Sequence, residues 1–493
     1  MKRFILSLIV GFTFVSTAIA QNEMDALRFS QIFPGGTARF TGMGGSFGAL
    51  GGDFSALSIN PAAIGVYRSS EFTITPVLNY NQVESRYFDT WQDDMKYNFN
   101  LNNAGVVFAF PIGGEPGGGG WQFVNFGLGI NRHNNFSERW IAGGFNPYSS
   151  RMAGLLQQAR HEGHVDNLDP FSTQLAWETW LLGEDEDGFF ADMLHGVDQY
   201  QETYTSGSVR EFVLSVGANY NDRLYLGATI GLPSVSYQEE SIFHEEDTQQ
   251  TNPIFNSMTF TNKHKTTGSG YNFKLGAIIR LTDIIRIGGA FHSPTFYELT
   301  DRYNATMRSD LELDYDSRFA RSPEGRFDYE LNTPMKLTGS LGLVFGTSGM
   351  INVDYEYIDY TKARLRSSDH LFTEENRNIR EAFTAQHAIR IGGELRLSPL
   401  IIRGGYGFYS NPYQPEVNDA QRSLISFGLG IRESDYFFDF SYVYSFYSED
   451  YFLYTLESDH PEDYNLPGDQ WKPPLVNRDF SLSSFRLTIG RRF

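Results

Sequence analysis

The chain has 493 residues, a formal net charge of -20 and no cysteine, so disulfides, thiol chemistry and a lipid-modified cysteine are excluded. The acidic balance argues against nucleic acid as a partner. Aromatic residues make up 15% of the chain and glycine occurs 49 times, which suits β-strands that carry aromatic girdles and end in tight turns. No linker, internal repeat or shift in composition divides the sequence, so we expect one continuous architecture.

The first twenty residues predict a secretory signal peptide, residues 1–20. Charged residues open it in Met1-Lys2-Arg3, an apolar run follows, and Ala18-Ile19-Ala20 gives the small-residue cleavage pattern. The run of about a dozen apolar residues is too short for a membrane-spanning helix, which needs roughly 20. No later apolar stretch is long enough for such a helix either. An exported soluble protein and a transmembrane β-barrel therefore remain as the two alternatives.

Residues 21–70 precede the first strand and predict a hatch, a plug of chain on the periplasmic side of a barrel lumen. Glycines such as Gly44 and Gly45 alternate with Phe, Met, Leu and Ile, and Asp53 is one of few charges. This composition has apolar surface to bury, unlike a disordered leader. Pro61 forces Asn60 out of the helical region, so Asn60-Pro61-Ala62 predicts a fixed turn.

From residue 71 onward, the sequence predicts an all-β protein, a transmembrane barrel of about fourteen antiparallel strands (domain 71–493). Period-two alternation is clear near 436–446, where aromatic residues occupy every even position. The strands are expected near 71–83, 99–111, 121–132, 209–221, 223–237, 269–282, 284–298, 334–346, 349–360, 386–398, 400–409, 422–433, 435–447 and 480–492.

The connections between these strands alternate between tight turns and long loops, and this decides between barrel and soluble sandwich. Five are tight, at 221–222, 282–283, 346–349, 398–399 and 433–434, and the others have about ten to seventy residues. Short periplasmic turns with longer outer loops are typical of outer-membrane barrels. We therefore expect an outer-membrane location, periplasmic termini, and outer loops near 136–208, 301–333 and 448–479.

The last strand alternates to the terminal Phe493, which resembles the C-terminal assembly signal of outer-membrane proteins. Arg491 departs from this pattern by falling on the lipid-facing side. A charge near the membrane interface costs only about 0 to 1 kcal/mol. The barrel assembly machinery and outer-membrane lipid are therefore the expected partners of a monomeric barrel.

The third strand raises two alternatives. Its lipid-facing apolar residues are followed by Asn131-Arg132-His133-Asn134-Asn135, which has no apolar member. Either the strand has left the membrane by Asn131, since roughly nine to eleven residues already span it, or it bends inward. A bend would open the wall beside Gly127 and Gly129, with Asn131 and Arg132 at the break.

The long outer loop 136–208 has more apolar residues than a loop needs. Leu155 and Leu156 recur with helical spacing, and Trp177 and Trp180 follow. These predict a helical segment whose apolar surface either packs on itself or binds a ligand.

Two other motifs resemble catalytic or metal-binding sequences but lack the rest of the pattern that such sites need. Residues 44–48 satisfy G-x-S-x-G, but the strand, helix and later acid and histidine of a hydrolase are missing. His161, His164 and Asp166 lack metal-binding spacing. We expect no enzyme activity, catalytic residue, metal or cofactor. Inward basic residues could hold a ligand carboxylate or pair with lumenal acids such as Asp354, Glu356 and Glu394; they are Lys274, Arg280, Arg286, Lys336, Arg390 and Arg396.

Several motifs in order along the chain resemble the long-chain fatty-acid and hydrocarbon transporter family of the FadL/TodX type. They are Gly-x-Ala-Arg-x-x-Gly-Met-Gly-Gly (residues 36–45), Asn60-Pro61-Ala62, Phe291-His292-Ser293-Pro294, Val353-Asp354-Tyr355-Glu356-Tyr357 and Arg403-Gly404-Gly405-Tyr406.

The resemblance implies a hatch-gated barrel for passive uptake of a hydrophobic small molecule, either a fatty acid or an aromatic hydrocarbon. It also implies a collecting groove in the long loop, at Leu155, Leu156, Trp177 and Trp180, and release of ligand sideways through the third strand. The alternative is a protein-interaction barrel similar to PorV-like secretion-system shuttles. A ligand pocket in the lumen would favour transport.

Overall fold

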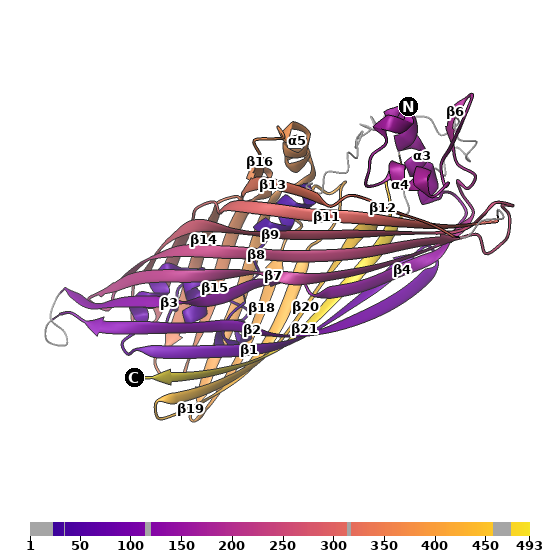
Figure 1. Ribbon diagram of the computed structural model, residues 1–493. Helices are drawn as coiled ribbons and strands as arrows, with labels where there is room; N and C mark the ends of the chain where they lie inside the picture. Colours follow the sequence, from indigo (N-terminus) through magenta and orange to yellow (C-terminus); the bar gives the residue numbers. More distant parts are fainter. Residues whose placement is uncertain (1–22, 34, 114–119, 313–316, 457–474) are drawn as a thin grey trace, which may run out of the picture.

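The computed structural model describes residues 23–33, 35–113, 120–312, 317–456 and 475–493 (Figure 1). The expected signal peptide, residues 1–20, lies outside this range. The chain forms a closed barrel of fourteen antiparallel strands, in which β1 (Glu71–Tyr87) pairs with the last strand, β21 (Leu475–Arg492). Within the described residues, no helix is long and apolar enough to span a membrane.

The barrel wall has fourteen strands, some of them made of two or three consecutive elements, and we call each of these fourteen a stave. Each of the fourteen predicted strands is confirmed as part of one stave. Going round from β1, the other elements of the wall are β2 (Thr90–Pro111), β3 (Trp121–Asn135) with β4 (Glu138–Asn146), β7 (Val197–Tyr220), β8 (Leu224–Glu246), β9 (Phe255–Arg280), β10 (Ile285–His292) with β11 (Phe296–Leu311), β12 (Arg318–Arg321) with β13 (Gly325–Asn332) and β14 (Lys336–Phe345), β15 (Gly349–Asp359) with β16 (Arg364–Arg366), β17 (Ala385–Leu397), β18 (Leu400–Tyr409), β19 (Arg422–Glu433) and β20 (Tyr436–Phe452). Two staves are interrupted at a proline, Pro294 and Pro334, as expected because proline lacks the N–H that a ladder needs.

The wall is taller than a membrane requires. β7, β8 and β9 have 24, 23 and 26 residues, whereas about nine to eleven residues cross a bilayer. In the halves of these strands that lie towards the tight turns, which we call the lower halves, the exposed residues are mostly apolar. In the half of β9 that lies towards the cap, which we call the upper half, Lys263 and Lys265 are exposed instead. Much of what the sequence suggested as outer loops, including parts of 136–208 and 301–333, is therefore barrel strand. The non-barrel part of the long loop is confined to residues 147–196.

The N-terminal residues form a plug inside the barrel. Its elements are α1 (Glu23–Ser30), α2 (Ala38–Gly42) and the 3-10 helices η1 (Phe54–Ser58) and η2 (Pro61–Val66), seen in indigo within the barrel in Figure 1. Side-chain caps start three of these short helices: Thr37 accepts from the Phe40 N–H, Asp53 from the Ser55 N–H and Asn60 from the Ala62 N–H.

A cap covers the end of the barrel opposite the C-terminus (Figure 1). It consists of α3 (Arg151–Glu162), η3 (Val165–Asn167), α4 (Thr173–Glu178) and the hairpin β5 (Gly183–Asp185) with β6 (Gly188–Phe190). Its apolar core is continuous with wall residues such as Phe243, Phe260 and Met307. A second insertion, η4 (Tyr360–Lys362) and α5 (Thr373–Ala382), lies at the same end.

Candidate functional site: a gap in the wall beside the third strand

Beside the third strand, neighbouring staves of the described barrel wall part. β2 and β3 are paired only from Pro111 and Phe123 up to Asn103 and Asn131. Above that point, residues 90–101 of β2 pair with β1 alone, and Arg132, Asn134 and Asn135 of β3 pair with β7 alone. The facing edges of β2 and β3 have therefore separated.

Above the paired region, β3 turns its side chains away from lipid. Asn131, Arg132, His133 and Asn134 are all buried, although alternate residues of a strand point to opposite faces. A register shift against β7 between Arg132 and Asn134 breaks the alternation. The strand ends at Asn135 and resumes as β4 at Glu138, still paired with β7. It thus stays in the barrel wall and turns inward.

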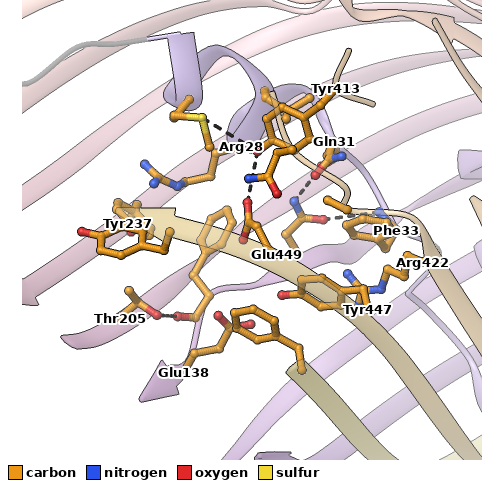
Figure 2. A pocket seen from close by; sticks show the side chains of 18 of the residues that line it. Arg28, Gln31, Phe33, Glu138, Thr205, Tyr237, Tyr413, Arg422, Tyr447 and Glu449 are labelled. Carbon is orange, nitrogen blue, oxygen red and sulfur yellow. Dashed lines mark hydrogen bonds between the residues drawn. The ribbon is translucent and has the colours of Figure 1, made fainter. Parts of the chain in front are cut away.

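The plug occupies the space between the two edges. The Asn102 Nδ2 atom donates to the Gly36 carbonyl oxygen at 2.7 Å. Asn134 donates to the Gln31 carbonyl oxygen at 2.6 Å and accepts from the Phe33 N–H at 3.3 Å (Figure 2). We call residues 31–33 and 35–36 the gap segment.

Hydrogen bonds close the gap at its lower and upper ends. Exposed apolar residues of β2, which we call the apolar lip, border it on the outer face. Below, the Asn103 Nδ2 atom donates to Asn131 Oδ1 at 2.6 Å. Above, the Lys96 Nζ atom donates to the Thr205 carbonyl oxygen at 2.8 Å. On the outer face, β2 exposes apolar residues along the gap, among them Tyr97, Phe99 and Leu101, with Phe99 at 74%. The opening therefore meets the surroundings at an apolar edge.

Inside the gap lies a cavity of about 1830 Å³ that extends up beneath α1 and α5. Its apolar lining comes from both plug and wall: Leu27, Phe33, Phe136, Trp140, Leu424, Val443 and Tyr447. The guanidinium of Arg422 lies 4.0 Å from the centre of the Phe33 ring and beside Tyr447 (Figure 2). The lining thus combines apolar rings with charged side chains of both signs, nine acidic residues and six arginines.

Glu138 on β4 lines the cavity above the point where β2 and β3 part. Burial raises the pKa of the Glu138 carboxyl above its ordinary value, and the charges of Arg422 and Arg478 oppose that rise. The upper cavity therefore favours an uncharged carboxyl more than water does.

The structure places the predicted hatch residues at plug-to-wall contacts. Asn60 donates to the Gly48 and Ala277 carbonyl oxygens at 2.6 and 3.2 Å, so it ties the turn before Pro61 and Ala62 to β9. Gly44 and Gly45 have positive φ angles of 64° and 72°, and the Gly44 N–H donates to Ser426 Oγ. Asp53 accepts from the Thr37 hydroxyl and the Ser55 N–H, and so joins two plug segments.

Two of the residues expected at the opening lie below it. Gly129 and Gly127 are opposite Gly105 and Val107, within the paired part of β2 and β3. A Cβ atom on Gly129 would lie 2.5 Å from the Phe54 ring, and one on Gly127 would lie 2.9 Å from Ile64. They give the plug room to approach the wall. Asn131 and Arg132, in contrast, stand where the strands part.

The four residues expected in a collecting groove differ in how far they are exposed to solvent. Leu155 and Leu156 are buried in the cap core with Phe189 and line no surface, which favours self-packing. Trp177 is partly buried against the same core. Trp180 is 45% exposed, with Arg318 over its ring.

The motifs weighed for catalysis and metal binding have structural roles. Ser46 of the G-x-S-x-G match is buried and donates to the carbonyl oxygens of Asn352 and Arg390. His164 caps η3 by accepting from the Asp166 N–H. The one group of three potential metal ligands found within the described ranges is elsewhere, at Asp25, His264 and Asp301, and Asp25 is ion-paired with Arg28.

Most lumenal basic residues have acidic partners. Lys274 pairs with Glu211, Arg390 with Glu356 at 3.1 Å, and Arg396 with Glu394 at 2.8 Å. Lys336 lies 3.5 Å from Glu356, and Arg280 pairs with Asp283. Arg286 donates to the Leu50 carbonyl oxygen of the plug.

Sequence reasoning did not single out Arg486, whose place on the inward side of β21 could have been found from the alternation alone.

No family model and no curated protein sequence matches the chain. Solved structures do share its fold. A FadL homologue from Pseudomonas aeruginosa is similar with a TM-score of 0.56 and 13% identity, over 94% of this chain and 99% of that one. The toluene transporter TbuX from Ralstonia pickettii gives 0.53 and 15% over 94% and 99%. The toluene transporter TodX from P. putida gives 0.52 and 13% over 94% and 99%.

Proposed function

We propose that this barrel is an outer-membrane channel for passive uptake of hydrophobic small molecules, since the fold that it shares belongs to proteins described as a FadL homologue and as toluene transporters. The observation that carries the proposal is the gap in the wall, which separates the cavity from the apolar lip on β2 and is filled by the gap segment. A molecule in the cavity would leave between β2 and β3 rather than through the plug.

The gap segment is the part of the plug that we propose moves. Residues 38–66 are hydrogen-bonded to many staves, for example Thr41 to Ser441 and the N–H groups of Phe47 and Gly48 to Asp354. The gap segment has no helix or strand, and two asparagines, Asn102 and Asn134, bond it to the wall. Segments with so few bonds open at the lowest free energy.

The lumenal cavity favours transport over the protein-interaction alternative. A barrel that serves only as a docking surface has no need of an 1830 Å³ cavity connected to a break in its wall. Hatch gating, periplasmic termini and assembly as a monomer belong to the same proposal.

Tying the gap segment to the wall should stop uptake. Phe33→Cys and Asn134→Cys, joined by a short bis-maleimide with a reductant-cleavable linker, would hold the segment in place. The chain has no other cysteine, so the reagent acts only there. Uptake of radiolabelled toluene and of a labelled long-chain carboxylate by intact cells should fall to background and recover after reduction.

The matched control ties the plug at its base instead. Thr41→Cys and Ser441→Cys replace two hydroxyls 2.9 Å apart, and the same reagent should leave uptake unchanged because residues 38–66 need not move. Full uptake with the gap segment tied would refute the gap as the route. Loss of uptake with the base tied would mean that the whole plug moves.

A further inference from the structure

Three side chains that are able to bind one metal ion meet where the first helix of the plug touches the wall. Asp25 comes from α1, His264 from the upper half of β9 and Asp301 from β11. One ligand atom of each lies within 4.8 Å of the other two. Asp301 is fully buried, Asp25 is 2% exposed and the His264 side chain is 14% exposed. The three groups are therefore held together inside the protein rather than spread over its surface.

The register of the sheet fixes the two ligands that the wall provides. Asp301 is paired with Thr266, which lies two residues from His264 on the same face of β9. His264 and Asp301 are therefore diagonal neighbours on adjacent strands. The Nε2 atom of His264 lies 3.6 Å from Asp301 Oδ2 and 2.8 Å from the Thr266 hydroxyl. An imidazole and a carboxylate so close to each other are stabilised by a proton or by a metal ion between them.

Negative charge exceeds positive charge in this group. Asp25 is ion-paired with Arg28, and Glu239 on β8, which is paired with His264 in the sheet, lies near enough to repel the Asp25 carboxylate. The ion-pair partner of Asp301 among the described residues is His264, which is charged only when protonated. Three carboxylates thus share one permanent cation, and burial makes such an excess costly. A divalent cation would balance it.

Tyr329 on β13 places a polar group beside the two aspartates. The residue is 3% exposed, and its hydroxyl is shielded from solvent and makes no hydrogen bond within the described chain. Both the Asp25 and the Asp301 carboxylates act on it electrostatically. A buried hydroxyl without a partner is unfavourable. Water that completes the shell of a metal ion held by three protein ligands would provide that partner.

We infer that Asp25, His264 and Asp301 form a site for a divalent transition-metal ion, with Zn²⁺ as the best fit, which ties the start of the plug to β9 and β11. One imidazole nitrogen and two carboxylate oxygens are ligands that zinc accepts together with water, whereas Ca²⁺ takes six to eight oxygens. Arg28 and Glu239 line the cavity, so an ion can reach the site from there. The sequence predicted no metal site, because these ligands come from three elements far apart in the chain.

The ion would fix one end of the gap segment. α1 ends at Ser30, directly before residues 31–33, and the hydrogen bonds of residues 38–66 hold the other end. Zinc binding is measured without any transport assay, so the inference is tested independently of the proposed function.

The test is zinc binding to the purified full-length barrel, prepared without a histidine tag and stripped with a chelator. Calorimetric titration should show one tight Zn²⁺ site, and Ca²⁺ should not bind there. Zn²⁺ in roughly hundredfold excess over its Kd should raise the melting temperature by mass action and slow amide exchange in residues 23–30. His264→Gln keeps a hydrogen-bonding group beside Thr266 but loses the nitrogen ligand, and Asp301→Asn loses a carboxylate. Each should weaken zinc binding at least about tenfold.

His244→Gln is the matched control. His244 lies on β8, bonds to Thr259 at 2.9 Å and lies 3.8 Å from one carboxylate, Glu246, but it belongs to no three-ligand group among the described residues. This variant should keep the wild-type zinc affinity and the wild-type shift in melting temperature.

Metal-free Asp301→Asn should melt at or above the temperature of the metal-free wild type, because one buried negative charge is removed. Its loss of zinc binding would then reflect the lost ligand and not misfolding, and a lower melting temperature would contradict the excess of charge on which the inference rests. Equal zinc binding by His264→Gln or Asp301→Asn, or no tight zinc binding by the wild type, would overturn the site.

Discussion

At the residue scale, the plug fits because the wall has glycine where the plug backbone comes closest. Gly227 on β8 is one such position, since a Cβ atom there would lie 2.2 Å from the Pro61 carbonyl oxygen. Gly405 on β18 is another, with Gly44 N at 2.3 Å from such an atom. The alternation predicted which positions face inward, but not which of them touch the plug, because that depends on contacts distant in sequence.

Gly227→Val should therefore displace the plug around η2 and make the barrel leaky. We expect faster entry of small hydrophilic antibiotics, measured as at least a severalfold lower inhibitory concentration in cells that express the variant. Gly289→Val is the matched control, because a Cβ atom on Gly289 meets nothing within 4 Å and the residue is exposed on the outer face. Equal antibiotic sensitivity of the two variants would refute the tight fit of the plug at β8.

At the scale of elements, membrane-spanning strands were predictable from sequence because lipid imposes an apolar residue at every second position. The upper halves of β7 to β9 were not, because water on the outside removes that pattern. In the third strand, the run without apolar residues marked the position of the break. Whether the chain left the wall there depended on pairing with β7 and on bonds to the plug, which local sequence does not encode.

Asn102→Ala with Asn134→Ala should loosen the gap segment and little else. Each change removes hydrogen bonds to the plug backbone worth about 1 kcal/mol net. Backbone amide exchange of residues 31–33 and 35–36 should therefore accelerate at least fivefold, while exchange in residues 38–66 stays as in the wild type. Unchanged exchange in the gap segment would mean that other contacts hold it.

At the scale of the whole molecule, composition and the alternation of loop lengths predicted the barrel, its fourteen staves and its plug, and the structure confirms these. The cap was predicted only as a helical segment. Its core with Phe243 and Phe260 joins residues distant in sequence, so local spacing could not show that Leu155 and Leu156 would be buried.

Orientation in the membrane is open to direct labelling. We predict that Glu186→Cys in the cap reacts with a membrane-impermeant maleimide added to intact cells, whereas Asp283→Cys in a tight turn reacts only after lysis. Both positions are exposed, and the absence of native cysteine removes background. The opposite pattern would place the long loops in the periplasm.

The central claim is that a hydrophobic molecule leaves through the gap between β2 and β3. Photo-cross-linking during uptake tests it most directly, with a dodecyl chain carrying a diazirine as the probe and peptide mass spectrometry as the readout. The account predicts cross-links in the cavity and on both edges of the gap, at residues 97–102 and 131–136, and their loss from the gap edges when Phe33→Cys is joined to Asn134→Cys. Cross-links that instead follow the plug towards the tight-turn end, around residues 43–66, with none at the gap, would contradict it.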